Sequence, residues 1–198
     1  MNLGEMLSGK AEAHARTNRI YGVVSGIVTN NHDPEGRARV KVHFPWMSDH
    51  AESDWAKLVT FMGGRQRGAV FLPEPGDEVL VAFEHGDLQH PYILGALWNA
   101  DDPPPETNQD GKNHLRVIKS RSGHEIILND TPGAEKIEIR DQSGQNVISI
   151  DTAKGELTLS SQTKLILRSQ QIEIEASSTL KVSASAALEL KGATVKIN

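Results

Sequence analysis

The chain has no cysteine and few aromatic residues, and both absences narrow its possible functions. Without cysteine it can form no disulfide, no thiolate metal site and no cysteine nucleophile. The nine aromatic residues all lie between Tyr21 and Trp98, so the second half of the 198-residue chain has none. Large side chains supply much of the area that a globular core buries, so this half would pack poorly as a self-contained monomer. We therefore expect it to need partners.

Basic charge and long apolar runs are scarce as well. The formal net charge is -5, and phosphate binding depends on clustered Lys and Arg that release counterions, so we expect no nucleic-acid partner. Residues 1–19 form a polar arm that carries Glu5 and lacks an unbroken apolar run. We expect neither a signal peptide nor a membrane-spanning helix there, and we expect assembly in the cytoplasm.

Residues 20–98 show short strand-like runs separated by turn residues, which predicts an all-β domain. The run 37–44 alternates, and the residues Asp33–Gly36 before it have Pro second and Gly fourth, as in a type I turn. The residues expected on the core face of this run are Ala38, Val40, Val42 and Phe44. Further strands are predicted at 23–28, 55–61, 69–72, 78–83 and 92–98, with loops at 63–64, 73–76 and 85–87. This number of short strands suits a small closed barrel such as an OB-fold.

Residues 99–113 have the composition of a linker. Three consecutive prolines, Pro103–Pro105, enforce an extended path, and the flanking acids and amides bury nothing. The linker separates the barrel from a tail over residues 114–198 with a different pattern.

In the tail, alternating apolar pairs recur at short intervals. From Leu157 onward, the first members of successive pairs are seven or eight residues apart. A strand of about five residues buries too little to stand alone, so the repeats must stack. A single-chain solenoid normally needs a coil of roughly 20 residues or more, which an octad does not supply. We therefore predict a homotrimer in which three intertwined chains form a triple-stranded β-helix, with Ile, Leu and Val along its axis.

The predicted trimer core consists of Ile137, Ile139, Ile148, Ile150, Leu157, Leu159, Leu165, Leu167, Ile172, Ile174, Leu180, Val182, Leu188 and Leu190. The last strand would leave an uncapped triangular face with unpaired edges. We predict that Val195, Ile197 and Asn198 form a docking platform for a tip protein on this face.

Three segments of the barrel region carry family motifs in order. They are DPEGRARVKVHFPW at 33–46, LPEPGDEVLVAFEHGD at 72–87 and PYILGALWN at 91–99. Over about eighty residues the chain resembles the OB-fold domain of phage baseplate assembly protein V and of VgrG spikes of type VI secretion. The octad repeat resembles the triple-stranded β-helix of the same family.

The resemblance implies a non-enzymatic central spike of a contractile injection system, part of a tail or injection particle. The OB domains would form a trimeric collar below the tail tube, and the needle would contact a target membrane transiently. About twenty residues precede the barrel, so the hub would be a separate protein, and the short linker leaves no room for a lysozyme domain. The last histidine is His124, so the His-x-His metal apex of some spikes is absent and a PAAR-type protein is the expected tip.

Several other groups of residues could be drawn as sites, and we expect no cofactor at any of them. His85 and His90, with Asp87 between them, could be drawn as zinc ligands. Zinc sites generally need three or four ligands with defined spacing, and no further clear ligand lies nearby in the sequence, so we interpret this segment as a loop of turn residues. Asp49, Glu52 and Asp54 form an acidic cluster, but a solvated loop does not shift carboxylate pKa values as catalysis requires.

The segment Gly63–Gly68 lacks the Gly-Lys-Ser/Thr ending of a phosphate loop. Two other functions stay open. One is a single-stranded nucleic-acid-binding OB protein, in which Tyr21, Trp46 and Trp55 would stack bases. The other is a trimeric fibre or adhesin that binds a surface glycan, although no aromatic residue follows Trp98 to stack on sugars.

Overall fold

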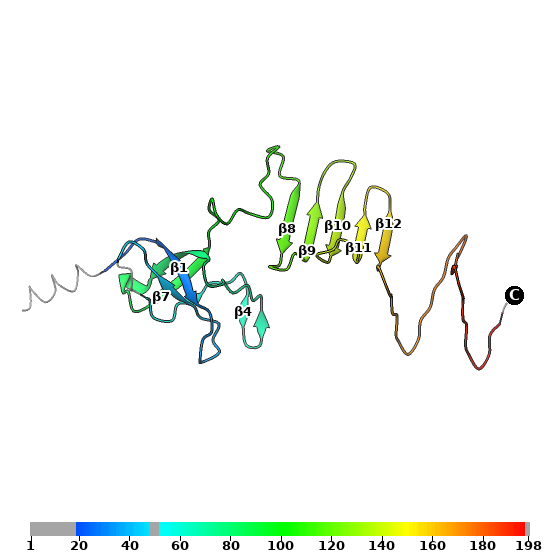
Figure 1. Ribbon diagram of the computed structural model, residues 1–198, viewed down its shortest axis with the longest axis horizontal. Helices are drawn as coiled ribbons and strands as arrows, with labels where there is room; N and C mark the ends of the chain where they lie inside the picture. Colours follow the sequence, from blue (N-terminus) through cyan, green and yellow to red (C-terminus); the bar gives the residue numbers. More distant parts are fainter. Residues whose placement is uncertain (1–18, 48–51, 197–198) are drawn as a thin grey trace, which may run out of the picture. The chain divides into compact units, whose positions relative to one another are not determined.

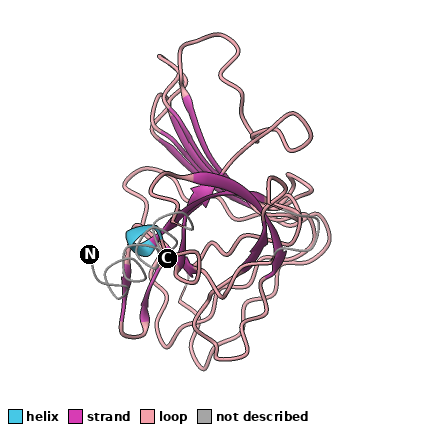
Figure 2. Ribbon diagram, turned by 90° about the vertical axis from the view of Figure 1, so that its left-hand side faces the viewer, coloured by secondary structure: helices cyan, strands magenta, loops and turns pink. Residues whose placement is uncertain are grey.

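The structure is a computed structural model that describes residues 19–47 and 52–196. The described part consists of strands and loops, with one short 3-10 helix, η1 (Glu84–Gly86), drawn in cyan in Figure 2. The chain divides into two compact units, Met1–Gln109 and Asp110–Asn198. The predicted all-β fold class is confirmed.

The first unit contains a closed five-stranded barrel (Figures 1 and 2). Its sheet has the strand order β2-β1-β6-β7-β3. The two edge strands meet through Val40 and Ala56, whose backbone N–H groups donate to each other's carbonyl oxygens at 3.1 and 2.8 Å. The strands are β1 (Val24–Asn30), β2 (Lys41–His43), β3 (Lys57–Leu58), β6 (Glu78–Phe83) and β7 (Pro91–Ala96).

The barrel core follows directly from period-two alternation. Along β6, Val79, Val81 and Phe83 point inward and are buried, while the residues between them are partly exposed. Each such side chain stabilises the fold by about 1.5–3 kcal/mol relative to an exposed one. The complete buried cluster is Val28, Val40, Val42, Phe44, Ala56, Val79, Val81, Phe83 and Ile93.

The predicted turn at Asp33–Gly36 is present, with Gly36 N–H donating to the Asp33 carbonyl at 3.0 Å. The predicted inward position of Ala38 is wrong. Ala38 has a φ of +55° and is exposed, so the extended run begins only at Val40. A residue in the left-handed region cannot continue the alternation of a strand, which explains the difference.

The predicted strand at 69–72 is also wrong, because no strand forms there. A two-stranded hairpin, β4 (Gly63–Gly64) and β5 (Arg67–Gly68), forms just before it, where a loop was predicted. Glycine-rich sequence weakens the strand signal, and here backbone pairing prevails over low β-propensity.

The second unit begins with a meander of five antiparallel strands in the order β12-β11-β10-β9-β8 (Figure 1). Each strand has five residues, and the turns include Gly123, Gly133, Gly144 and Gly155, all with positive φ. The strands are β8 (Leu115–Lys119), β9 (Glu125–Asn129), β10 (Lys136–Arg140), β11 (Val147–Asp151) and β12 (Glu156–Ser160). All the ladders of this meander therefore form within one chain.

After β12 the described chain contains no strand. It bends at positions beginning at 162, 170, 177, 185 and 193, which are seven or eight residues apart. The intervals match the spacing of the apolar pairs. The segment 161–196 thus has the predicted repeat but lacks the backbone ladder that normally stabilises such a repeat.

Candidate assembly surface

The meander has one apolar face, which we call the apolar sheet face. Cross-strand partners place like residues together: Ile137 lies opposite Leu128 on one side and Ile150 on the other. Its members are between 42% and 65% exposed in the single chain. They are Ile118, Ile126, Leu128, Ile137, Ile139, Ile148, Ile150, Leu157 and Leu159. Soluble monomers rarely expose a contiguous apolar surface of this kind, so the face is suited to an interface.

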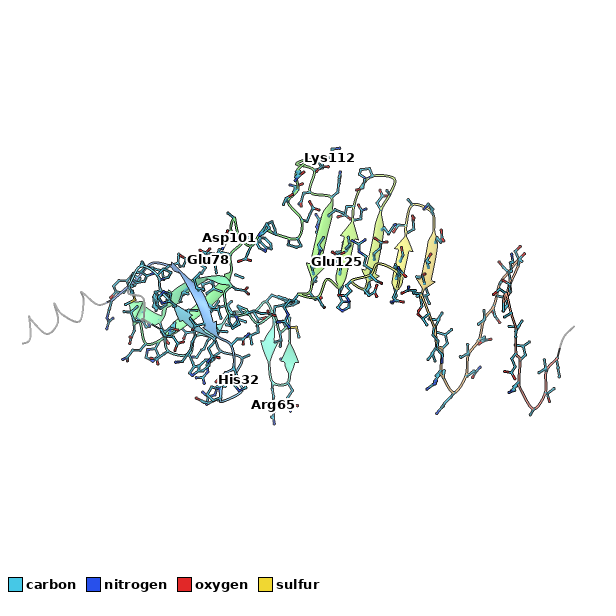
Figure 3. The ribbon with its side chains drawn as sticks, in the orientation of Figure 1. His32, Arg65, Glu78, Asp101, Lys112 and Glu125 are labelled. Carbon is cyan, nitrogen blue, oxygen red and sulfur yellow. The ribbon has the colours of Figure 1, made fainter. Side chains whose placement is uncertain are left out.

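The opposite face is polar and better covered. The Glu125 side chain, labelled in Figure 3, is 12% exposed and pairs with Lys119 at 3.0 Å and Arg140 at 2.5 Å. These two cations lower the pKa of Glu125, the Lys119 hydrogen bond contributing most. Charge pairs across neighbouring strands stabilise this face without a partner. The apolar face has no comparable cover.

Three members of the apolar sheet face were missed by sequence reasoning: Ile118, Ile126 and Leu128. The consecutive residues Ile126, Ile127 and Leu128 hide the alternation, and only the structure separates them. Ile127 lies on the polar face and is 8% exposed, whereas its two neighbours are 42% exposed. The alternation at Ile137 and Ile139 would have identified them if extended backward through the turn.

The structure brings together the predicted core residues of β10, β11 and β12 on this face. It does not bring together those that follow. They are Leu165, Leu167, Ile172, Ile174, Leu180, Val182, Leu188 and Leu190, all between 53% and 66% exposed. Val195 is 53% exposed, while Ile197 and Asn198 lie outside the described residues. The tip-docking role of these last three residues remains a prediction.

The barrel residues weighed as catalytic or metal sites have local structural roles. The pKa of Asp87 is lowered, mainly by the backbone N–H of Gln89 and further by His90, whose ring nitrogen lies 3.3 Å from the carboxylate. His85 occupies η1. Over the described ranges, no group of three or more His, Cys, Asp or Glu side chains is placed to hold a metal ion.

The acidic cluster is not arranged as a catalytic pair. Glu52 accepts hydrogen bonds from Lys41 at 2.8 Å and from Thr29 at 2.7 Å, and these contacts lower its pKa. A carboxyl group that acts as a general acid needs a raised pKa. The pKa of Glu52 is lowered, so this side chain is not suited to that role. Asp54 is exposed, and Asp49 lies outside the described residues.

A pocket of about 460 Å³ lies beside Trp55 and Tyr92. Arg39 and Lys41 lie over the Trp55 ring, 5.8 and 5.6 Å from its centre. The lining also contains carboxylates, and Tyr92 donates to Glu84 at 2.8 Å. A single-strand groove needs a continuous basic track, which mixed charges do not provide.

The barrel matches a known domain family over residues 24–98, described as the type VI secretion system/phage-baseplate injector OB domain. The chain is 31% identical over 112 residues to the type VI secretion system spike protein VgrG3 of Vibrio cholerae, covering 52% of this chain and 11% of that protein. It is 32% identical over 130 residues to the spike protein VgrG1a of Pseudomonas aeruginosa, covering 58% and 20%.

A longer match, 28% identical over 160 residues, is to the actin cross-linking toxin VgrG1 of Vibrio cholerae, covering 78% of this chain and 14% of the toxin. The chain therefore spans between 11% and 20% of the length of these three relatives. Within the residues that the structure describes, no helix is both long and apolar enough to cross a membrane.

Proposed function

Because the barrel of this chain matches the injector OB domain of type VI secretion systems and phage baseplates, we propose that the chain is the central spike of a contractile injection system. Its similarity to VgrG spike proteins supports a spike or baseplate role. The proposed role is mechanical, and no residue of the chain is assigned to catalysis.

The apolar sheet face is the observation that carries this proposal. Nine Ile and Leu side chains are presented by a sheet whose other face is already covered by ion pairs. Three such faces, one from each of three identical chains, can pack around a common axis and remove these side chains from water. The polar faces then remain outside, so the assembly is a soluble prism.

The segment 161–196 supports a second mode of contact between the same chains. Its backbone finds no ladder within its own chain, although its apolar pairs recur every seven or eight residues. If three copies wind together, each run becomes a strand between runs of the other copies, and the backbone groups are paired. We propose that this segment forms the interwound part of the needle.

The proposed partners are assigned to the two units of the chain. A hub and the tail tube would bind on the barrel side, and a PAAR-type protein would bind the needle near Val195. The needle would enter the target membrane only transiently. A dense, aliphatic axis with paired strands suits axial load, which is what piercing requires.

Light scattering of the purified full chain tests the proposal. We expect the mass of three 21.6 kDa chains, independent of moderate salt because the interface is apolar. A particle of one chain would contradict the proposed spike. In the cell of origin, deletion of the chain should abolish functional particles, and the wild-type chain should restore them.

A further inference from the structure

The β4–β5 hairpin presents apolar and basic side chains that nothing in the described chain covers. Phe61, Val70 and Phe71 are 84%, 78% and 61% exposed, and the two phenyl rings lie 6.4 Å apart. Arg65 and Arg67 flank the tip of the hairpin and have no ion-pair partner among the residues the structure describes. Such a combination is costly on a free surface and typical of an interface.

A groove of about 510 Å³ lies at the base of the hairpin. Apolar side chains form much of its lining, which also includes Arg67 and Arg37, whose guanidinium pairs with Glu35 at 2.6 Å. The apolar lining residues are Ala38, Leu58, Met62, Ala69 and Val70. The expected occupant is therefore apolar along its length and carries negative charge.

One segment of the chain has this chemistry. Asp101 and Asp102 precede Pro103–Pro105, and both aspartates are exposed with no side-chain partner in the described ranges. The amide oxygen of Asn99 accepts the backbone N–H groups of Asp101 and Asp102 at 3.0 and 2.8 Å, which orders the start of the segment. Proline-rich segments adopt an extended helix that docks against aromatic side chains with little loss of entropy. Phe61 and Phe71 are not in the groove lining but are next in sequence to its members Met62 and Val70.

Topology places the hairpin and this segment at the same end of the barrel. β3 runs parallel to β7, with Lys57 opposite Tyr92, and the hairpin follows β3 while the proline segment follows β7. Within one chain, however, they lie on opposite flanks: Figure 3 shows Arg65 and Asp101 far apart across the first unit. The chain's own linker therefore does not occupy its own groove.

We propose that the β4–β5 hairpin and its groove hold the acidic, proline-rich segment 101–105 of a neighbouring copy. This inference rests on the proposed trimer. Rotation about a three-fold axis keeps the equivalent ends of all copies at one level, so the hairpin of one copy is at the same height as the linker segment of the next copy. Arg65 and Arg67 then face Asp101 and Asp102, and the prolines cover the exposed phenylalanines. The contact is cyclic, and each copy both holds and is held.

Site-specific cross-linking of the full chain tests this contact. The chain has no cysteine, so Gln66→Cys with Ala100→Cys places one thiol on each side of the proposed contact and leaves all four charges in place. After treatment with a short bismaleimide, we expect dimer and trimer bands on a denaturing gel. Arg65→Glu with Arg67→Glu in this background should lower the cross-linked yield about tenfold, and adding Asp101→Arg with Asp102→Arg should restore it.

A matched control replaces Gln66→Cys by Gln89→Cys, an exposed position beside η1, outside the hairpin, and should give no ladder. Light scattering of each sample separates two kinds of failure. A trimer in solution that yields only monomer bands would overturn the proposed contact between the hairpin and segment 101–105, and would leave the proposed function intact. A monomer in solution would overturn both. A cross-linked yield that changes with neither charge reversal would also overturn the proposed contact.

Discussion

Asp33 holds the turn that leads into β2. Its carboxylate accepts backbone N–H groups of Glu35 and Arg37, both at 3.0 Å, and two guanidinium contacts from Arg39 at 2.8 and 2.7 Å. The side chain is 3% exposed. The hydrogen bond from Arg39 is the main reason that the pKa of Asp33 lies far below its ordinary value. One carboxylate thus organises the first turn of the barrel.

Asp33→Asn should lower the melting temperature of the barrel by several degrees, because its amide nitrogen would face donors instead of accepting from them. Glu35→Gln is the matched control, since the Glu35 side chain is 49% exposed and makes only solvent-facing contacts, to Arg37 at 2.6 Å and to Arg39 at 2.9 Å. Thermal unfolding followed by circular dichroism measures both variants. Equal melting temperatures for Asp33→Asn and the wild type would contradict this role.

The same carboxylate makes stability depend on pH. Because the pKa of Asp33 is lower in the folded state, its contribution is fully present above the ordinary Asp pKa of about 4 and is lost as the pH falls through the folded value. The side-chain hydrogen bond from Asn146 lowers the pKa of Asp141 to about 2, which acts in the same direction. The melting-temperature difference between the wild type and Asp33→Asn should therefore shrink from pH 6 to about pH 2. A constant difference would contradict the linkage.

At the scale of the elements, the meander separates two kinds of surface by a single step along the strand. Ile148 lies on the apolar sheet face, and Ser149 lies on the covered polar face of β11. Substitutions at these two adjacent residues can therefore be compared directly, because their position along β11 and their backbone context are nearly the same.

Ile148→Asp should convert the trimer to monomers, because three carboxylates would enter a dry interface at a cost of about 3–5 kcal/mol each. Ser149→Asp adds the same charge to the outer face and should leave the trimer intact. Sedimentation or light scattering distinguishes the two. A trimeric Ile148→Asp variant would show that this face does not lie at the axis.

Leu165→Asp with Leu167→Asp tests the segment after β12 in the same way. Both leucines lie on the predicted axial side, and we expect loss of trimer assembly. Lys164→Asp with Arg168→Asp is the control, since these residues alternate with the leucines and should point outward. Loss of the trimer in the control but not in the leucine variant would show that the register is reversed.

At the scale of the whole molecule, the meander has its backbone ladder within one chain, and the segment 161–196 does not. The two parts should differ in how their hydrogen bonds depend on assembly. Amides of β8–β12 have partners in a single chain, whereas those after Ser160 acquire ladders only from other copies.

Hydrogen exchange followed by mass spectrometry should show slow exchange over 161–196 in the assembled protein and fast exchange in the Ile148→Asp monomer. Exchange in the middle strand β10 should change less between the two samples, because both of its neighbours, β9 and β11, belong to the same chain. Fast exchange over 161–196 within an intact trimer would contradict the interwound needle.

The alternation of residues by itself determined the all-β class, the barrel strands around Val79 and Val81, and which side chains of the tail must avoid water. These features depend on neighbours in sequence, because side chains alternate along an extended backbone whatever it pairs with. The tertiary structure alone decided what each strand pairs with. Positive φ at Ala38 delayed a strand, and glycine turns closed β8–β12 within one chain, while the described run 161–196 found no strand partner. Pairing is set by hydrogen bonds between distant segments, which a local pattern does not specify.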